Sequence, residues 1–110
     1  MQSILYIFHN FITYSILAMI KSFVHKGLEK FFYTGITSGI QVKHSKRLRL
    51  ILDLLDGASN IQDLNFPGSN LHRLKGDKQE LWSIKVSGNW RIIFKFAREN
   101  VYLIDYLDYH

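Results

Sequence analysis

The spacing of apolar residues predicts two helices in the first part of the chain. One is expected over residues 25–34, with an apolar stripe formed by Leu28, Phe31 and Phe32. The other is expected over residues 42–58, where the i, i+3, i+4, i+7 pattern is carried by Leu48, Ile51, Leu52 and Leu55. Gly35 and Gly57 stand where each pattern stops, as is typical of helix ends.

After residue 70 the apolar period changes from the helical spacing to two, which indicates β-strands. Strands are expected over 71–75, 81–87, 90–96 and 101–107, with a further short strand over 20–23. Ser87-Gly88-Asn89 is expected to form one tight hairpin turn and Glu99-Asn100 a second. The pattern predicts an α+β fold, with two N-terminal helices packed on one face of a mostly antiparallel sheet.

The pattern leaves open which face of the sheet carries Arg91. If residues 88–89 form a two-residue turn, Val86 pairs with Arg91, and Arg91 shares the face of Ile84. A three-residue loop would reverse that assignment.

The first 18 residues differ from the rest because they contain no Lys, Arg, Asp or Glu. A membrane span needs about 20 apolar residues, and this stretch is shorter and interrupted by polar ones. A signal peptide begins with basic residues, and this stretch has none. We expect Met19 to be the true start, with residues 19–110 as the domain and 1–18 outside the fold.

The charge pattern suggests a polyanionic partner. The chain holds 14 basic and 9 acidic residues, for a formal charge of +5. Up to residue 50, Glu29 is the sole acidic residue, against Lys21, Lys26, Lys30, Lys43, Lys46, Arg47 and Arg49. Such asymmetry favours nucleic acid or a membrane surface. The absence of cysteine excludes disulfides and thiolate metal sites, and the histidines show no metal-ligand spacing.

A basic cluster stands at the start of the second predicted helix, at Lys46, Arg47 and Arg49. A helix N-terminus favours anions, so cations there are unfavourable unless an external polyanion supplies the countercharge. The alternative is a solvated helix face balanced by Asp53 and Asp56.

Two segments hold candidate catalytic groups. His72 and Lys75 precede Gly76, and strict alternation would place them on opposite faces unless the strand ends or bulges near Leu74. At the other segment, His110 follows directly on the last predicted strand. In each case a structural role for the histidine remains the alternative.

Together these segments resemble the HigB branch of the RelE toxin superfamily. The resemblance covers Met19 to His110 and is carried by Leu71–Asp77, Trp82–Ile84, Asn89–Ile92 and Asp108–His110. It implies a RelE-like, strongly twisted small sheet. It also implies an active site formed by His72, Lys75, Arg91, Asp108, Tyr109 and His110, with RNA and ribosome contacts from Lys43, Lys46, Arg47, Arg49 and Arg73.

The activity implied is that of a type II toxin that cleaves messenger RNA on the ribosome. Attack of a 2′-hydroxyl on the neighbouring phosphate needs no metal or cofactor. Proton transfer suits the two histidines, and charge stabilisation suits Lys75 and Arg91. The implied partners are a helix-turn-helix antitoxin of the HigA type, the 70S ribosome and mRNA, in the cytoplasm and without a membrane.

Two alternatives remain. ParE-like members share the fold but poison DNA gyrase through protein contact and are expected to lack the catalytic His and Lys. A non-catalytic nucleic-acid-binding module is the other.

Overall fold

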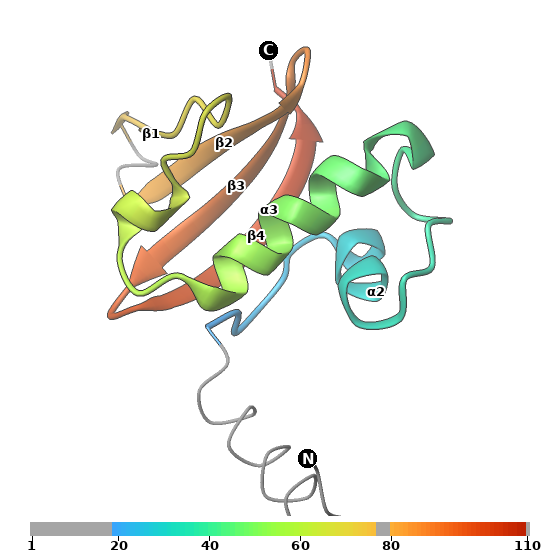
Figure 1. Ribbon diagram of the computed structural model, residues 1–110, viewed down its shortest axis with the longest axis horizontal. Helices are drawn as coiled ribbons and strands as arrows, with labels where there is room; N and C mark the ends of the chain where they lie inside the picture. Colours follow the sequence, from blue (N-terminus) through green and yellow to red (C-terminus); the bar gives the residue numbers. More distant parts are fainter. Residues whose placement is uncertain (1–18, 77–79, 110) are drawn as a thin grey trace, which may run out of the picture.

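The computed structural model describes residues 19–76 and 80–109 and has an α+β fold, as predicted. Its helices are α2 (Lys26–Thr34) and α3 (Ser45–Gly57), with 3-10 turns η1 (Val42–His44) and η2 (Ile61–Leu64). Its strands are β1 (His72–Arg73), β2 (Leu81–Ser87), β3 (Trp90–Ala97) and β4 (Asn100–Asp108). They form one antiparallel sheet in the order β1-β2-β3-β4 (Figure 1). The predicted leader, residues 1–18, lies outside the described residues.

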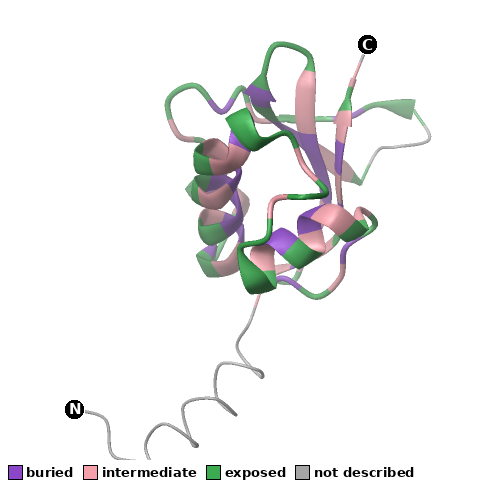
Figure 2. Ribbon diagram, turned by 90° about the vertical axis from the view of Figure 1, so that its right-hand side faces the viewer, coloured by how far each residue is buried: buried purple, intermediate pink, exposed green. Residues whose placement is uncertain are grey.

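The core lies between the helices and one face of the sheet. Helix α3 stands on one side of the strands with its buried residues turned toward them (Figure 2). Its predicted stripe is fully buried, at Leu48, Ile51, Leu52 and Leu55. Helix α2 adds Leu28 and Phe31 to the same core. Within the described residues, no helix has both the length and the apolar character to cross a membrane.

Local hydrogen bonds fix the ends of α2. The Leu28 amide donates to Nδ1 of His25 at 2.9 Å, which caps the N-terminus. At the other end Gly35 has φ 78° and its amide donates to the Phe31 carbonyl. Glycine adopts this left-handed conformation at low cost, so the predicted stop at Gly35 is confirmed.

Residues 19–24 extend the sheet beyond β4 in the parallel direction. Isolated bridges join Ile20 to Val101 and Phe23 to Ile104. The Lys21 amide donates to the Val101 carbonyl at 2.7 Å. The sheet is therefore mostly antiparallel, with one short parallel edge contributed by the start of the domain.

A β-bulge in β2 decides the face of Arg91. Ser87 pairs with Trp90, so the turn is the two-residue one, Gly88-Asn89, of the two alternatives that the sequence left open. The register then shifts between Lys85 and Ser87, and Lys85 rather than Val86 pairs with Arg91. The extra residue is Val86, which points into the core. Arg91 therefore lies on the face away from the helices.

The second hairpin turns one residue earlier than the sequence suggested. Ala97 pairs with Asn100, so the turn residues are Arg98 and Glu99, with φ 52° and 66°. The prediction of Glu99-Asn100 was wrong because neither Arg98 nor Glu99 is a residue type that marks a left-handed turn.

We call the helix-free side of the sheet the open face. Directly paired residues share a face, so the registers of the strands assign to it His72, Leu81, Ser83, Lys85, Arg91, Ile93, Lys95, Tyr102, Asp105 and Leu107. Most of these side chains are exposed or half-buried, whereas Ser83 and Ile93 are buried. The open face is where chemistry-bearing side chains meet solvent.

Candidate active site on the open face

Two rows of paired residues bring His72 and Arg91 to the same part of the open face. One row runs His72, Ser83, Ile93, Asp105, and the next runs Lys85, Arg91, Leu107. From β1 to β3 is two strand spacings, and Ile93 to Arg91 is two residues. Together these put the Cα atoms of His72 and Arg91 roughly 12 Å apart. Two long side chains can reach a phosphate group placed between such positions.

The imidazole of His72 is exposed and held in one tautomer. Its Nδ1 lies 2.9 Å from the carbonyl oxygen of Asn70. A carbonyl only accepts hydrogen bonds, so Nδ1 carries the hydrogen and Nε2 of the neutral ring carries the lone pair. Nε2 is therefore suited to accept a proton from a substrate.

The strand that carries His72 ends before Lys75, which is the condition for the two side chains to lie on the same face. Strand β1 ends at Arg73, and the Leu74 amide donates to the Leu81 carbonyl at 2.8 Å. Leu74 is buried, Lys75 is exposed, and Gly76 has φ 73°. The chain thus leaves the strand directly before Lys75. Among the described residues no hydrogen bond joins Lys75 to His72, and residues 77–79 lie outside the described ranges.

The guanidinium of Arg91 is anchored at the β2–β3 hairpin. Its Nη1 donates to the carbonyls of Gly88 at 2.7 Å and Trp90 at 3.0 Å. A guanidinium has five N–H donors in all, so these bonds orient the group without using up its capacity for phosphate.

The end of β4 lies beside that hairpin rather than fraying away from it. Asp108 pairs with Trp90, and the Tyr109 amide donates to the Asn89 carbonyl at 2.8 Å. Figure 1 shows the C-terminal end next to the β2–β3 turn. Asp108 and Tyr109 are therefore held at the Arg91 end of the sheet. His110 lies outside the described residues.

Lys85 is a candidate that sequence reasoning missed. It is exposed and pairs directly with Arg91, so two cations stand side by side on the open face. Without the Val86 bulge, alternation assigns these two residues to opposite faces. No sequence signal marks the bulge, because Val86 fits the alternating apolar pattern of the strand.

Arg73 does not share the face of His72. It pairs with Trp82, and its guanidinium carbon lies 5.9 Å from the centre of the Trp82 ring. A contact with ribosomal RNA through Arg73 would therefore involve the other side of β1.

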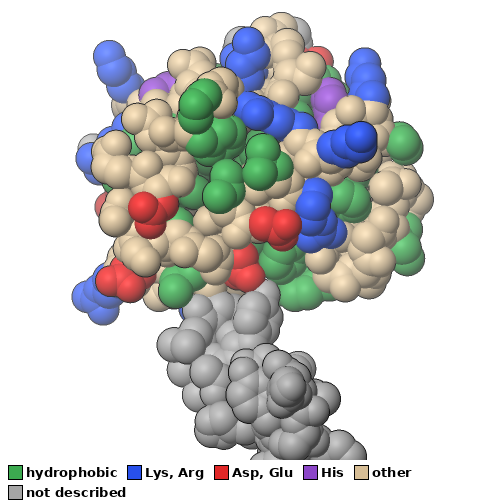
Figure 3. All heavy atoms as spheres, in the orientation of Figure 1, with side chains coloured by type: hydrophobic (Ala, Val, Ile, Leu, Met, Phe, Trp, Pro, Cys, Tyr) green, Lys and Arg blue, Asp and Glu red, His purple; other side chains and the backbone are tan. Residues whose placement is uncertain are grey.

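The basic cluster of α3 divides into two kinds of residue. Arg47 donates to the carbonyls of Gly68 at 2.8 Å and Lys85 at 3.0 Å. Arg49 donates to the Phe31 carbonyl at 2.9 Å and stacks on the Phe31 ring at 4.8 Å. These two arginines join α3 to neighbouring segments. Lys43 and Lys46 are exposed, and Figure 3 shows blue side chains gathered over the start of α3.

A buried cluster of polar groups lies on the helix side of the sheet, next to the strand end that carries Arg91. Nδ1 of His44 lies 2.6 Å from the Tyr106 hydroxyl, which also accepts from the Gln41 amide at 3.3 Å. Burial lowers the pKa of His44, with a smaller contribution from Lys43, and burial raises the pKa of Tyr106. Both rings pack against Trp90, which precedes Arg91. We read this group as structural, since its polar atoms bond to one another.

No group of three or more His, Cys, Asp or Glu side chains in the described ranges is arranged to hold a metal ion. The open face therefore carries the imidazole of His72 in a fixed tautomer, the cations Lys85 and Arg91, and the ring of Tyr102.

Comparison with known proteins assigns the chain to a family. Residues 21–110 match the family model of the RelE-like toxin of type II toxin–antitoxin systems, HigB. A curated relative from Proteus vulgaris, Endoribonuclease HigB, is 46% identical over 92 residues, which is 84% of this chain and 100% of the relative. The chain therefore belongs to the HigB-like, RelE-like toxins of type II toxin–antitoxin systems.

Proposed function

We propose that this toxin is an endoribonuclease that cleaves messenger RNA on the ribosome in the cytoplasm and needs no metal for the chemistry. The observation that carries the proposal is the fixed tautomer of His72 on the face that also holds Arg91. The relative's name, Endoribonuclease HigB, supports it at 46% identity.

In the proposed reaction, Nε2 of His72 takes the proton of a 2′-hydroxyl. The 2′-oxygen bonds to the neighbouring phosphorus, and the bond from phosphorus to the 5′-oxygen breaks. The products are a 2′,3′-cyclic phosphate and a 5′-hydroxyl, with His110 as the proposed donor of the proton that the leaving oxygen takes. His72 then returns its proton to solvent and His110 takes one up, which restores both groups for the next cleavage.

The remaining site residues have supporting roles. Arg91 and Lys75 would stabilise the negative charge that develops on the phosphate, the kind of interaction that is often the largest in such catalysis. Tyr109 would stack on a base. Asp108, one residue before it, would orient Arg91 or an imidazole.

Ribosome binding is assigned to the exposed face at the start of α3 and to Arg73. Lys43 and Lys46 would contact ribosomal phosphates, since both are exposed and lie in η1 and in the first turn of α3, respectively. Arg47 and Arg49 belong to the same proposed surface, with part of their donor capacity already directed inward. As a type II toxin the chain has an antitoxin partner, which we propose is a helix-turn-helix protein of the HigA type.

The reaction is tested by incubating the purified protein with translating ribosomes and mapping message ends. We expect cleavage that persists in EDTA and leaves a 5′-hydroxyl. A message with a 2′-deoxynucleotide before the scissile phosphate should resist cleavage there. His72→Ala should lower the rate about 100-fold or more, the range usual for such groups. Cleavage by the His72→Ala variant at the wild-type rate would rule out the assignment.

The ribosome surface needs a separate test. Lys43→Glu with Lys46→Glu should flatten the dependence of ribosome affinity on salt concentration. Lys26→Glu with Lys30→Glu, at two exposed positions of α2, makes the same change in net charge. This matched control should change that slope less. Equal slopes for the control and the double variant would remove Lys43 and Lys46 from the surface.

The gyrase-directed alternative predicts a different result in the first experiment. A ParE-like protein would leave the message intact and inhibit DNA supercoiling by gyrase instead.

A further inference from the structure

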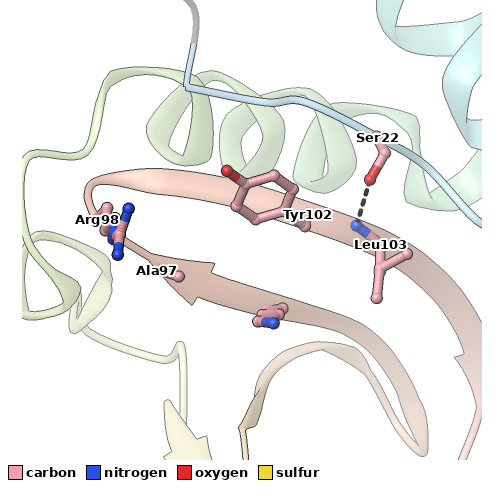
Figure 4. A pocket seen from close by; sticks show the side chains of 6 residues that line it. Ser22, Ala97, Arg98, Tyr102 and Leu103 are labelled. Carbon is pink, nitrogen blue, oxygen red and sulfur yellow. Dashed lines mark hydrogen bonds between the residues drawn. The ribbon is translucent and has the colours of Figure 1, made fainter.

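A hollow opens on the sheet beyond the proposed catalytic residues, at the β3–β4 hairpin. Its volume is about 390 Å³, and we call it the edge pocket. It is lined by Ser22, Lys95, Ala97, Arg98, Tyr102 and Leu103 (Figure 4). The Leu103 amide donates to Oγ of Ser22 at 2.9 Å, which joins the parallel edge to β4 along one wall.

The edge pocket combines two cations with an aromatic ring. Lys95 pairs directly with Tyr102 across β3 and β4, so their side chains lie next to each other. Arg98 follows at the turn of the same hairpin. Positive groups beside a half-buried aromatic side chain are what proteins use to bind single-stranded nucleic acid, with phosphates on the cations and a base on the ring.

The edge pocket lies on the same face of the sheet as the proposed active site. Along β3, Arg91 and Lys95 lie on the same face, four residues apart, which corresponds to about 13 Å. A strand of RNA with one phosphate at Arg91 would therefore reach Lys95 within a few nucleotides.

Two residues that line the edge pocket have a left-handed backbone conformation, which is strained for their residue types. Arg98, Glu99 and Leu103 have φ values of 52°, 66° and 57°. Side chains other than Gly, Asn and Asp rarely adopt this conformation, and such strain gathers at ligand-binding positions. Two of the three strained residues, Arg98 and Leu103, line the pocket. A turn selected for folding alone would have Asn-Gly here.

We infer that the edge pocket binds the RNA substrate at nucleotides adjacent to the scissile bond. One base stacks on Tyr102, and the flanking phosphates contact Lys95 and Arg98. This inference rests on the proposed function, because it extends the path of the same substrate.

Glu80 forms an ion pair with one of these cations, Lys95. Its Oε1 lies 3.3 Å from Nζ of Lys95, and the two side chains are 64% and 38% exposed. An exposed ion pair of this kind is weak, so a phosphate can replace the carboxylate. Removing the charge with Glu80→Gln should therefore strengthen RNA binding.

The inference is tested by fluorescence anisotropy with a 2′-O-methyl oligoribonucleotide, which lacks the nucleophilic hydroxyl and cannot be cleaved. Tyr102→Ala should weaken binding about fivefold or more, through loss of one stacked base. Tyr102→Phe, which keeps the ring, should restore it. Arg98→Asn should lower the slope of log affinity against log salt by about 0.7, the value for one phosphate of a single strand.

Two controls separate binding from folding and from net charge. Glu99→Asn relieves strain in the same turn without touching the pocket, and it should not weaken binding. Lys30→Gln removes one positive charge from α2, which lies away from the β3–β4 hairpin (Figure 1), and should leave the slope nearer to wild type. Asn tolerates a left-handed backbone, so the Arg98→Asn fold should be at least as stable as wild type.

The outcomes distinguish this inference from the proposed function. Unchanged RNA affinity in both Tyr102→Ala and Arg98→Asn overturns the edge pocket, even if His72→Ala still abolishes cleavage. Weaker capture of the antitoxin by these variants with RNA affinity unchanged would also overturn it, since the pocket would then serve a protein. Loss of affinity together with the Tyr102→Phe rescue supports it, whatever the result for His72.

Discussion

Arg49 offers a direct test of whether a cation in the basic cluster of α3 stabilises the fold. Truncation to alanine removes its hydrogen bond to the Phe31 carbonyl at 2.9 Å, its contact with the Phe31 ring at 4.8 Å and its ion pair with Asp53 at 3.6 Å. All three join α3 to the C-terminal end of α2 or to its own next turn.

The size of the effect follows from these contacts. A hydrogen bond from a charged group contributes about 1.5–3 kcal/mol, and partial exposure places this one at the lower end. The contact with the ring adds about 0.5 kcal/mol at such a site. The Asp53 pair adds a few tenths, about 0.3 kcal/mol, because it is solvent-exposed. Arg49→Ala should therefore lower the free energy of unfolding by about 2 kcal/mol.

Urea unfolding followed by tryptophan fluorescence measures this loss. With a slope of about 1–1.5 kcal/mol per molar, the midpoint should fall by roughly 1.3–2 M while the slope stays the same. Lys46→Ala, which removes an exposed cation three residues away, is the matched control and should cost less than about 0.5 kcal/mol. Asp53→Asn isolates the ion pair and should also cost little. If Arg49→Ala and Lys46→Ala unfold at the same urea concentration, the structural role of Arg49 is refuted.

Three further predictions concern other parts of the molecule. Burial lowers the pKa of His44 from its ordinary 6.5. The stability that neutral His44 contributes is therefore fully present above pH 6.5 and is lost as the pH falls through the lowered pKa. Between about pH 7 and 5, the wild type should lose more stability than His44→Gln. Ser83→Ala should leave the melting temperature unchanged or raise it, because Oγ of Ser83 is buried without a hydrogen-bond partner among the described residues; a clear fall would reveal a missing partner. A chain that begins at Met19 should unfold with the same midpoint as the full chain, and mass spectrometry of the native protein should show Met19 as its first residue; a native mass that includes residues 1–18 would contradict this.

The elements with strong periodicity were predictable from sequence. Strand β2 spans the expected residues 81–87, and the apolar stripe of α3 is the predicted one. Both follow from alternation or helical spacing, which local sequence carries. The start of the second helix was less predictable: residues 42–44 form η1, and α3 begins at Ser45. Its first residues follow the position of buried His44, whose partner Tyr106 is 62 residues away.

What sequence did not reveal depends on backbone atoms and register. The bulge at Val86 changes the face of Arg91, yet no residue type announces it. From the sequence, Arg47 and Arg49 were predicted to bind an external polyanion. In the structure they donate to the carbonyl oxygens of Gly68, Lys85 and Phe31, and the positions of such backbone atoms cannot be predicted from the sequence. The catalytic roles came from family resemblance, and they remain predictions until the variants are assayed.

The parallel edge formed by residues 19–24 also constrains how the protein is made. Ile20 and Phe23 reach their partners, Val101 and Ile104, only across nearly the whole domain. While the chain is being synthesised, the helices emerge first, and their apolar stripes have no sheet to cover. The edge can close only after residue 104 has left the ribosome, so pairings so distant in sequence should make folding slow compared with helix formation. The core of the nascent chain therefore stays incomplete, and its apolar side chains stay open to chaperones, until β4 has been synthesised.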